Sequence, residues 1–329
     1  MKNLIRELVE SYGPSGFETD VTDKIIDLIK DYVDDFYVDT LGNLIAHKKG
    51  NGKTVMFSAH TDEIGVVITH IDKNGFLRFD RVGGLNTLTL LGNRVRFANG
   101  VIGVIGREKG TLKDFAIDKM FIDIGAESRE QAKEQVSIGD FAVFHREFTD
   151  LGNRVVAKSM DDRIGCVVLI EAIRKLNKTN HDLYFVFSTQ EEVGLRGART
   201  AAYGIEPDLG IALDVTMTGD TPEAPRMDVS LGSGAAIKVK DSSLIAHPKV
   251  KELLIRLAEE KKIDYQLEVL PAGGTDAGAI HLTKEGVPSG TISIPCRYVH
   301  TVSEMVDVRD VKNCIDLVLA VIQDQLDEF

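Results

Sequence analysis

The feature that most restricts the fold of this 329-residue chain is a change of pattern along its length. Apolar runs of strand length alternate with amphipathic helices at both ends, whereas residues 66–156 show short alternating strands joined by hairpin turns. Asn74-Gly75 and Asn99-Gly100 lie between such strands, and Asn-Gly is a strong hairpin signal. Strands that alternate with helices predict a mostly parallel sheet sandwiched by helices. We therefore expect an α/β catalytic domain of residues 1–65 and 157–329, with a small β-barrel domain of residues 66–156 inserted into it.

The expected elements of the α/β part follow from the spacing of apolar residues. Helices are predicted over Asn3–Tyr12, Thr19–Val33, Asp162–Leu176, Pro248–Lys261 and Val308–Leu326, and strands over Leu44–Ala46, Val55–Ala59, Leu183–Phe187, Ile211–Val215 and Thr291–Ile294. A single core rarely exceeds about 250–300 residues, so two domains suit this length.

Charge and composition exclude several classes of protein. A net charge of −12 argues against nucleic-acid binding, which usually needs a basic surface, and against anionic membranes. We expect no membrane span and no signal peptide, because Arg6, Glu7 and Glu10 interrupt the first apolar stretch. The three cysteines are scattered and odd in number, which indicates a reducing cytoplasm and no disulfide framework.

Five polar clusters lie where apolar strands end or where a helix begins. They are His60-Thr61-Asp62, Asp161-Asp162-Arg163, Gln190-Glu191-Glu192, Asp214 and His300. Ligands of open α/β sheets bind beyond the carboxyl ends of the strands, so these clusters can converge at one edge. Alone, Asp161 could cap a helix and the two glutamates could be solvated. Together, two histidines and several carboxylates have the composition of a divalent-metal site.

The charges of this set suit two metal ions. The predicted ligands are His60, Asp161, Glu192, Asp214 and His300. Three carboxylates against two divalent ions leave a net charge of about +1, which favours a bridging hydroxide. Glu191, next to a ligand, suits a general base, and Asp62 suits a role in orienting the His60 imidazole.

The motifs that carry these residues resemble those of the M42 family of metallo-aminopeptidases. They are Ser58-Ala59-His60-Thr61-Asp62-Glu63-Ile64-Gly65, Met160-Asp161-Asp162-Arg163-Ile164-Gly165, Gln190-Glu191-Glu192-Val193-Gly194, Leu213-Asp214-Val215 and Tyr298-Val299-His300-Thr301, together with Gly13-Pro14-Ser15-Gly16 and Asp39-Thr40-Leu41-Gly42-Asn43. The resemblance covers essentially the whole chain, in order.

The resemblance implies a role for each of these residues. Asp161 would bridge two metal ions. These would be zinc or cobalt, and the ligand chemistry also allows manganese. The peptide bond from Asp161 to Asp162 would be a candidate for the cis form. The remaining ligands would pair as His60 with Asp214 and Glu192 with His300, and Glu191 would accept the proton. The resemblance also implies short peptides as substrates and a homo-oligomer, often a dodecamer in the family.

A glycine-rich stretch, Gly273–Gly278, does not match a phosphate-binding loop because it has no Walker lysine. We expect Gly274, Thr275 and Asp276 within it to line the substrate pocket, as the family position suggests.

Other functions remain open at this point. The nearest is a related two-metal deacylase or carboxypeptidase-type amidase, and a more distant one is a non-catalytic assembly protein stabilised by its metal. A structural zinc site has no use for a spare carboxylate such as Glu191, which argues against the second. Glycoside hydrolysis normally needs two opposed carboxyl groups and no metal, which disfavours that activity.

Overall fold

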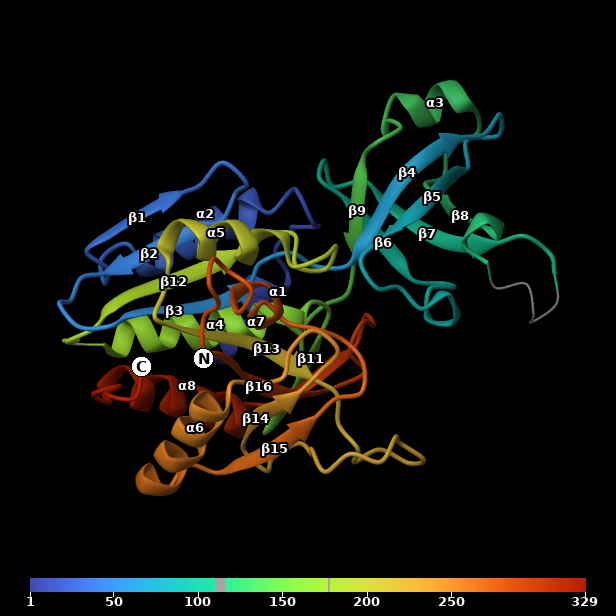
Figure 1. Ribbon diagram of the computed structural model, residues 1–329. Helices are drawn as coiled ribbons and strands as arrows, with labels where there is room; N and C mark the ends of the chain where they lie inside the picture. The colour runs from blue at the N-terminus through green and yellow to red at the C-terminus, as the bar shows by residue number, and fades with distance from the viewer. Residues whose placement is uncertain (111–115, 177) are drawn as a thin grey trace.

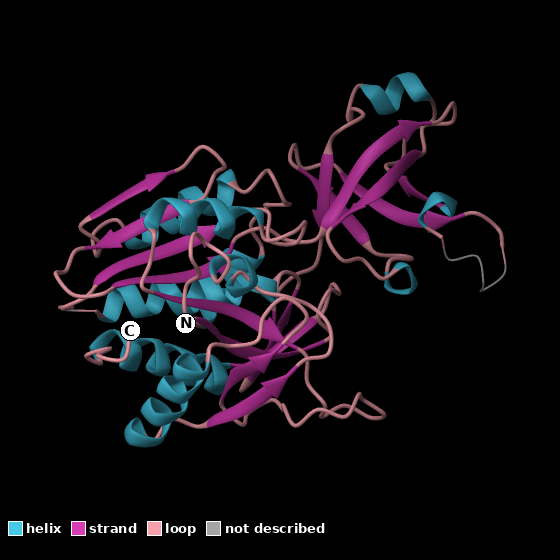
Figure 2. Ribbon diagram, viewed as in Figure 1, coloured by secondary structure: helices cyan, strands magenta, loops and turns pink. Residues whose placement is uncertain are grey.

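The computed structural model describes residues 1–110, 116–176 and 178–329 and divides into two parts. The elements before residue 65 and those after residue 148 build a large sheet with helices on its two faces, and the segment between them forms a separate barrel (Figure 1). The barrel consists mostly of strands, whereas helices flank the sheet (Figure 2). The predicted fold class, α/β with an inserted β-barrel, is confirmed.

Four parallel strands form the centre of the large sheet. In spatial order they are β12 (Asp182–Ser188), β3 (Thr54–His60), β13 (Leu209–Thr216) and β16 (Ser289–Arg297). Antiparallel pairings extend this centre on both sides. The flanking strands are β1 (Asp35–Val38) and β2 (Leu44–Lys48) beside β12, and β17 (Glu304–Asp307), β11 (Arg154–Ala157) and β10 (Thr149–Leu151) beyond β16. A further pair, β14 (Ala235–Lys240) and β15 (Tyr265–Val269), also joins β16. Parallel pairing is thus concentrated at the centre, where the strands are fully covered.

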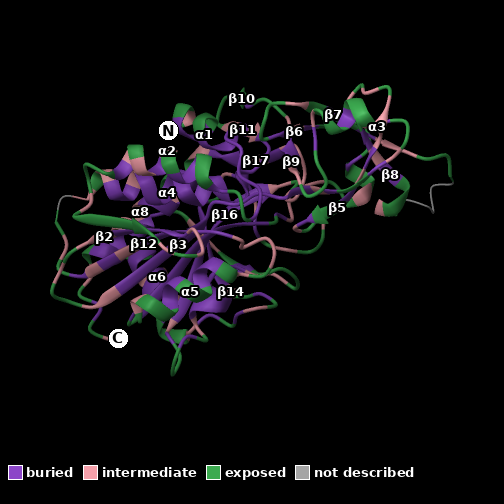
Figure 3. Ribbon diagram, turned by 90° about the horizontal axis from the view of Figure 1, so that it is seen from above, coloured by how far each residue is buried: buried purple, intermediate pink, exposed green. Residues whose placement is uncertain are grey.

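Two apolar layers cover the sheet because successive side chains of a strand point to opposite faces. Phe57 of β3 belongs to the larger core, and its neighbour Met56 packs into a smaller core on the other face. The larger core includes residues of α1 (Lys2–Val9), α2 (Thr19–Ile29), α4 (Met160–Lys175), α6 (Pro248–Lys261) and α8 (Val308–Gln323). The smaller core includes residues of α5 (Arg196–Ile205) and α7 (Ala277–Ile280). The central strands β3, β12 and β16 are buried between these layers (Figure 3).

The barrel closes in the order β4-β5-β8-β7-β6-β9 around its own apolar core. Its elements are β4 (Gly65–Ile71), β5 (Leu77–Val82), η1 (Thr87–Thr89), β6 (Arg94–Phe97), β7 (Ile102–Arg107), η2 (Ile117–Lys119), β8 (Met120–Asp123), α3 (Arg129–Lys133) and β9 (Phe141–Phe144). Both Asn-Gly dipeptides form hairpin connections, with positive φ at Gly75 and Gly100. Strands β10 and β11 fall within the range predicted for the insertion, yet they pair at the edge of the large sheet.

No helix in the described part of the chain has the length and apolar character needed to cross a membrane.

Candidate metal centre

The residues predicted as ligands come together at the carboxyl ends of the central strands. His60 ends β3, Asp214 lies near the end of β13, and Asp161 lies at the start of α4. One ligand atom from each of these three residues lies within 4.8 Å of the other two. His60 Nε2 is 3.0 Å from Asp161 Oδ1. The Asp161–Asp162 peptide bond is cis.

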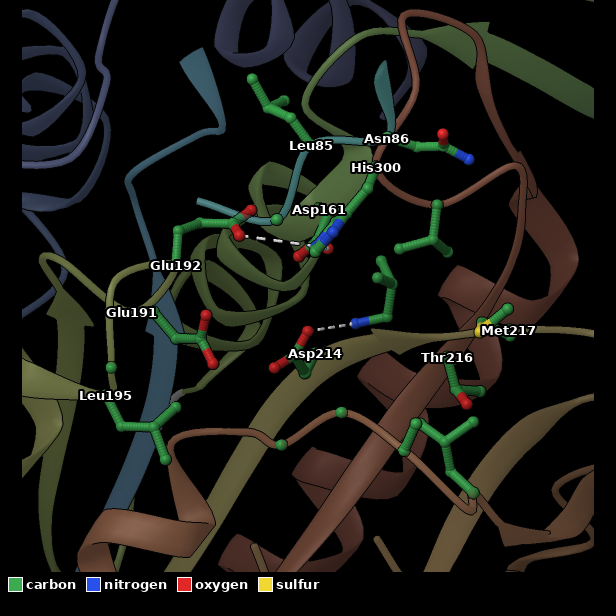
Figure 4. A pocket seen from close by; sticks show the side chains of 18 of the residues that line it. Leu85, Asn86, Asp161, Glu191, Glu192, Leu195, Asp214, Thr216, Met217 and His300 are labelled. Carbon is green, nitrogen blue, oxygen red and sulfur yellow. Dashed lines mark hydrogen bonds and ion pairs between the residues drawn. The ribbon is translucent and has the colours of Figure 1, made fainter. Parts of the chain in front are cut away.

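A second group of three shares Asp161 with the first. Asp161, Glu192 and His300 also offer ligand atoms within 4.8 Å of one another. His300 Nε2 lies 3.3 Å from Asp161 Oδ2 and 3.4 Å from Glu192 Oε2. The two oxygens of Asp161 therefore face two different histidines, and the side chains converge on one space (Figure 4).

The buried carboxylates around this space favour the binding of cations. Burial raises the pKa of the Glu192 carboxyl, and the nearby charge of Asp161 raises it further. The same two causes raise the pKa of Asp214. Glu192 Oε1 is buried without a hydrogen-bond partner within the described structure. Two imidazoles and three carboxylates that repel one another fit divalent ions such as zinc, which would neutralise them.

Glu191 lies beside these groups but belongs to neither set of three. Its Oε2 is 3.8 Å from His60 Nε2 and faces the same space (Figure 4). Burial raises the pKa of Glu191, opposed by the nearby imidazole of His60, and the charges of Asp214 and Glu192 raise it further. A carboxyl with a shifted pKa that faces a cavity is a candidate for proton transfer.

Asp62 connects His60 to the two glutamates. Its Oδ1 is 3.4 Å from His60 Nδ1 and accepts a hydrogen bond of 2.9 Å from the Glu191 backbone N–H. Its Oδ2 accepts hydrogen bonds from the Glu192 N–H at 3.2 Å and from the Ser15 hydroxyl at 2.6 Å. Asp62 thus contacts the loop that carries both glutamates as well as the imidazole, and has more partners than its spacing from His60 predicted.

Glu304, a residue that the sequence did not single out, joins the second group. Its Oε1 accepts the His300 N–H at 2.7 Å, and its Oε2 accepts the Asp161 N–H at 3.1 Å. Burial and the nearby charge of Asp161 raise the pKa of Glu304 to about 8. No short sequence motif marks a carboxylate that accepts hydrogen bonds from backbone N–H groups. The only sequence signal for this role of Glu304 was its position four residues after His300.

The barrel supplies one wall of the site through the loop after β5. A Cβ atom on Gly84 would lie 2.6 Å from His300 Nδ1, and one on Gly83 would lie 3.1 Å from Glu192 Oε2. Gly83 also has a φ of +80°. Glycine at both positions therefore allows the barrel to approach the imidazole and carboxylate closely.

A cavity of about 690 Å³ opens onto this centre. Gly274 lines it, as predicted, but Thr275 and Asp276 lie behind its wall. Asp276 accepts hydrogen bonds of 2.5 Å from Ser58 and Ser188 on the neighbouring strands β3 and β12, and the Thr275 hydroxyl is 3.1 Å from that of Thr291. The predicted contact of Thr275 and Asp276 with substrate is therefore not supported, because both are buried in the packing beneath the loop.

Comparison with known proteins identifies the family. The family model described as M42 glutamyl aminopeptidase matches residues 42–317. The chain belongs to the M42 aminopeptidase family. The resemblance found in the sequence motifs is thus confirmed, and this M42 protein is an enzyme that hydrolyses peptides.

Similar proteins agree with this assignment over nearly the whole M42 chain. The lysyl aminopeptidase of Pyrococcus furiosus is 38% identical, with 98% of this chain and 96% of that protein aligned. The structure of an aminopeptidase from the archaeon Desulfurococcus kamchatkensis superposes with a TM-score of 0.95 at 44% identity, covering 98% of this chain and 94% of that one. The TET1 peptidase of Pyrococcus horikoshii, described as able to assemble into a tetrahedron or a large octahedral shell, gives a TM-score of 0.88 at 34% identity, with 98% and 99% covered.

Proposed function

We propose that this aminopeptidase uses two divalent metal ions that share Asp161. The other ligands would be His60 and Asp214 for one ion, and Glu192 and His300 for the other. The observation that carries the proposal is the position of Asp161, whose Oδ1 faces His60 at 3.0 Å while its Oδ2 faces His300 at 3.3 Å. Nitrogen and carboxylate ligands of this kind suit zinc or cobalt, and manganese is compatible with them.

When bound, two such ions supply Lewis acidity to the scissile carbonyl and lower the pKa of water at the site. Glu191 then serves as the general base. Its carboxylate faces the same space, takes a proton from the attacking water and gives it to the departing amine nitrogen. The backbone N–H of Glu191 donates a hydrogen bond to Asp62, and this contact holds Glu191 in place. The Glu191 carboxylate therefore remains free to exchange a proton.

Pairs of peptides that differ only in an N-terminal acetyl group test the substrate part of the proposal. Metal-free protein is refilled with zinc or cobalt and assayed for release of the first residue. We expect cleavage of the free-amino peptides alone, lost on metal removal and restored by refilling. Release of the acyl group from the acetylated set would instead indicate a deacylase, and no turnover of either set would indicate a non-catalytic metal protein.

We also propose that the chain acts as a homo-oligomer, with a dodecamer as the expected form. The support is its similarity to the TET1 peptidase of Pyrococcus horikoshii, described as able to form a tetrahedron, and to a structure 35% identical to this chain that is described as a dodecamer. The mass of the native particle in solution tests this assembly.

A further inference from the structure

The cavity beside the candidate metal centre has two sides of different chemistry. Strand ends and loops of the large sheet form one side, and Arg81 with residues 84–86 of the barrel form the other. The proposed ligands lie between them, with Leu85 and Asn86 on one side and Leu195, Thr216 and Met217 on the other (Figure 4). A substrate that fills the cavity therefore contacts both sides.

The sheet side offers an uncharged surface. Its larger side chains are Leu195, Val215, Met217, Leu270 and Val299, and the rest of its uncharged lining is Gly194, Thr216, Ala272, Gly273 and Gly274. Apart from the proposed ligands and Glu191, none of the described residues that line this side carries a charge. The nearest buried lysine, Lys238, is paired with Glu268 and Asp241 and is not available to a substrate.

The barrel side instead presents a cation. Arg81 of β5 lines the cavity and is exposed to solvent. Within the described structure, its guanidinium has no hydrogen-bond or ion-pair partner. An arginine repels the ammonium group of a peptide and attracts a carboxylate, so the two ends of a short peptide are not equivalent here.

We propose that the cavity holds a short peptide lengthwise, with an apolar first side chain on the sheet side and its C-terminal carboxylate toward Arg81. This inference rests on the proposed function and adds the substrate class to it. The N-terminal ammonium then lies toward Glu191 and Asp214, away from the arginine. The peptide's own charges thus match the charges along the cavity.

The uncharged lining selects against charged first residues for a physical reason. A lysine or glutamate side chain on the sheet side loses water without gaining a partner, whereas a leucine or methionine side chain buries apolar area. Met217 is 47% exposed, so this side stays partly open and water reduces the penalty. Discrimination of about tenfold in kcat/KM is the expected order of magnitude.

The first test compares dipeptides X-Ala with leucine, methionine, lysine or glutamate as X, on metal-loaded enzyme. We expect leucine and methionine to exceed lysine and glutamate by about tenfold in kcat/KM. Faster release of lysine or glutamate would overturn the inference while leaving the aminopeptidase proposal intact. Failure to cleave any of the four would remove the proposed function and this inference with it.

The second test changes the charge of the sheet side at a half-exposed position. Met217→Glu and Met217→Gln have nearly the same size and differ in charge. Relative to Met217→Gln, Met217→Glu is expected to raise the ratio of lysine to leucine cleavage roughly fivefold. An unchanged ratio would show that Met217 does not contact the first side chain and would contradict the assignment of this side.

The third test concerns Arg81 and the C-terminal carboxylate. Wild-type enzyme should prefer Leu-Ala over its C-terminal amide roughly threefold, as expected for one exposed ion pair, and Arg81→Met should abolish that preference. If Arg81→Met instead removes a preference for an N-terminal glutamate, the arginine binds the first side chain and the proposed direction of the peptide is wrong.

Discussion

At the scale of single residues, the candidate site depends on carboxylates that each serve more than one neighbour. Asp161 faces two histidines, Asp62 accepts hydrogen bonds from Ser15 and from two backbone N–H groups, and Glu304 accepts two more. Because these carboxylates are buried, each needs its partners for charge or hydrogen-bond compensation. The result is a set of ligands whose positions depend on one another.

The variant Glu191→Gln distinguishes the proposed role of Glu191 as a general base from that of a metal ligand. The amide keeps the size of the side chain but cannot accept a proton, so kcat should fall by about a thousandfold while KM changes little. Metal content should stay at the wild-type value, because Glu191 lies outside both groups of ligands. The matched variant Glu192→Gln should lose metal as well as activity. A Glu191→Gln enzyme with most of its activity would contradict the assignment.

The sequence predicted the candidate ligands and the contact of Asp62 with His60, but not the other residues that contact the candidate ligands. Each ligand lies beside the end of an apolar strand or at the start of a helix, and a metal site restricts the residue types, so His60, Asp161 and Asp214 could be recognised. The Glu304 carboxylate accepts hydrogen bonds from backbone N–H groups, which almost every residue offers, and the Ser15 hydroxyl donates to Asp62. No spacing rule identifies such contacts.

At the scale of elements, one loop of the barrel completes a site built by the sheet. The loop from Gly83 to Asn86 follows β5 and lies against Glu192 and His300. This approach requires that two consecutive residues have no side chain. The barrel thus contributes to the geometry of the ligands although it supplies none of them.

Gly84→Ala tests this contact against a control glycine. The added methyl would lie 2.6 Å from His300 Nδ1, so the imidazole or the loop must move. We expect weaker metal binding and a kcat/KM lowered by about tenfold or more. Gly204→Ala near the end of α5 meets no atom within 4 Å, and its activity should match wild type. Equal activity of both variants would show that the loop is not constrained by His300.

The sequence predicted helices and strands well where the spacing of apolar residues determines them. It predicted poorly which sheet a short strand joins, because strand pairing determines that. The parallel centre follows from alternating strands and helices. Strands β10, β11 and β17 are short, and short strands can join either of two neighbouring sheets. The sequence therefore placed residues 149–156 with the barrel, whereas β10 and β11 pair at the edge of the large sheet.

At the scale of the whole molecule, the candidate metal centre lies where the large sheet and the barrel meet (Figure 1). The chain passes from β3 to β4 through residues 61–64, and Glu63 in this connection pairs with Lys158 at 2.6 Å and with Arg163 at 3.3 Å. These buried ion pairs tie the passage into the barrel to Lys158, which follows β11, and to Arg163 of α4. Removing one partner would leave an uncompensated buried charge.

The assembly is tested on the intact protein. Light scattering coupled to size-exclusion chromatography should give a mass close to twelve times the 36.1 kDa of one chain. The mass of a smaller oligomer would support the proposal of a homo-oligomer and exclude the dodecamer. A single-chain mass that persists at high protein concentration would contradict both.

The most direct test of the central claim, two ions that share Asp161, is a count of metal ions per chain. Zinc-saturated, dialysed protein is measured by elemental analysis for wild type, Asp214→Asn and Asp161→Ala, each with its fold checked by circular dichroism. We predict two ions for wild type, about one for Asp214→Asn, and close to none for Asp161→Ala, because only Asp161 belongs to both ligand groups. A single ion in saturated wild type, or an Asp161→Ala protein that retains one tightly bound ion, would contradict the shared site.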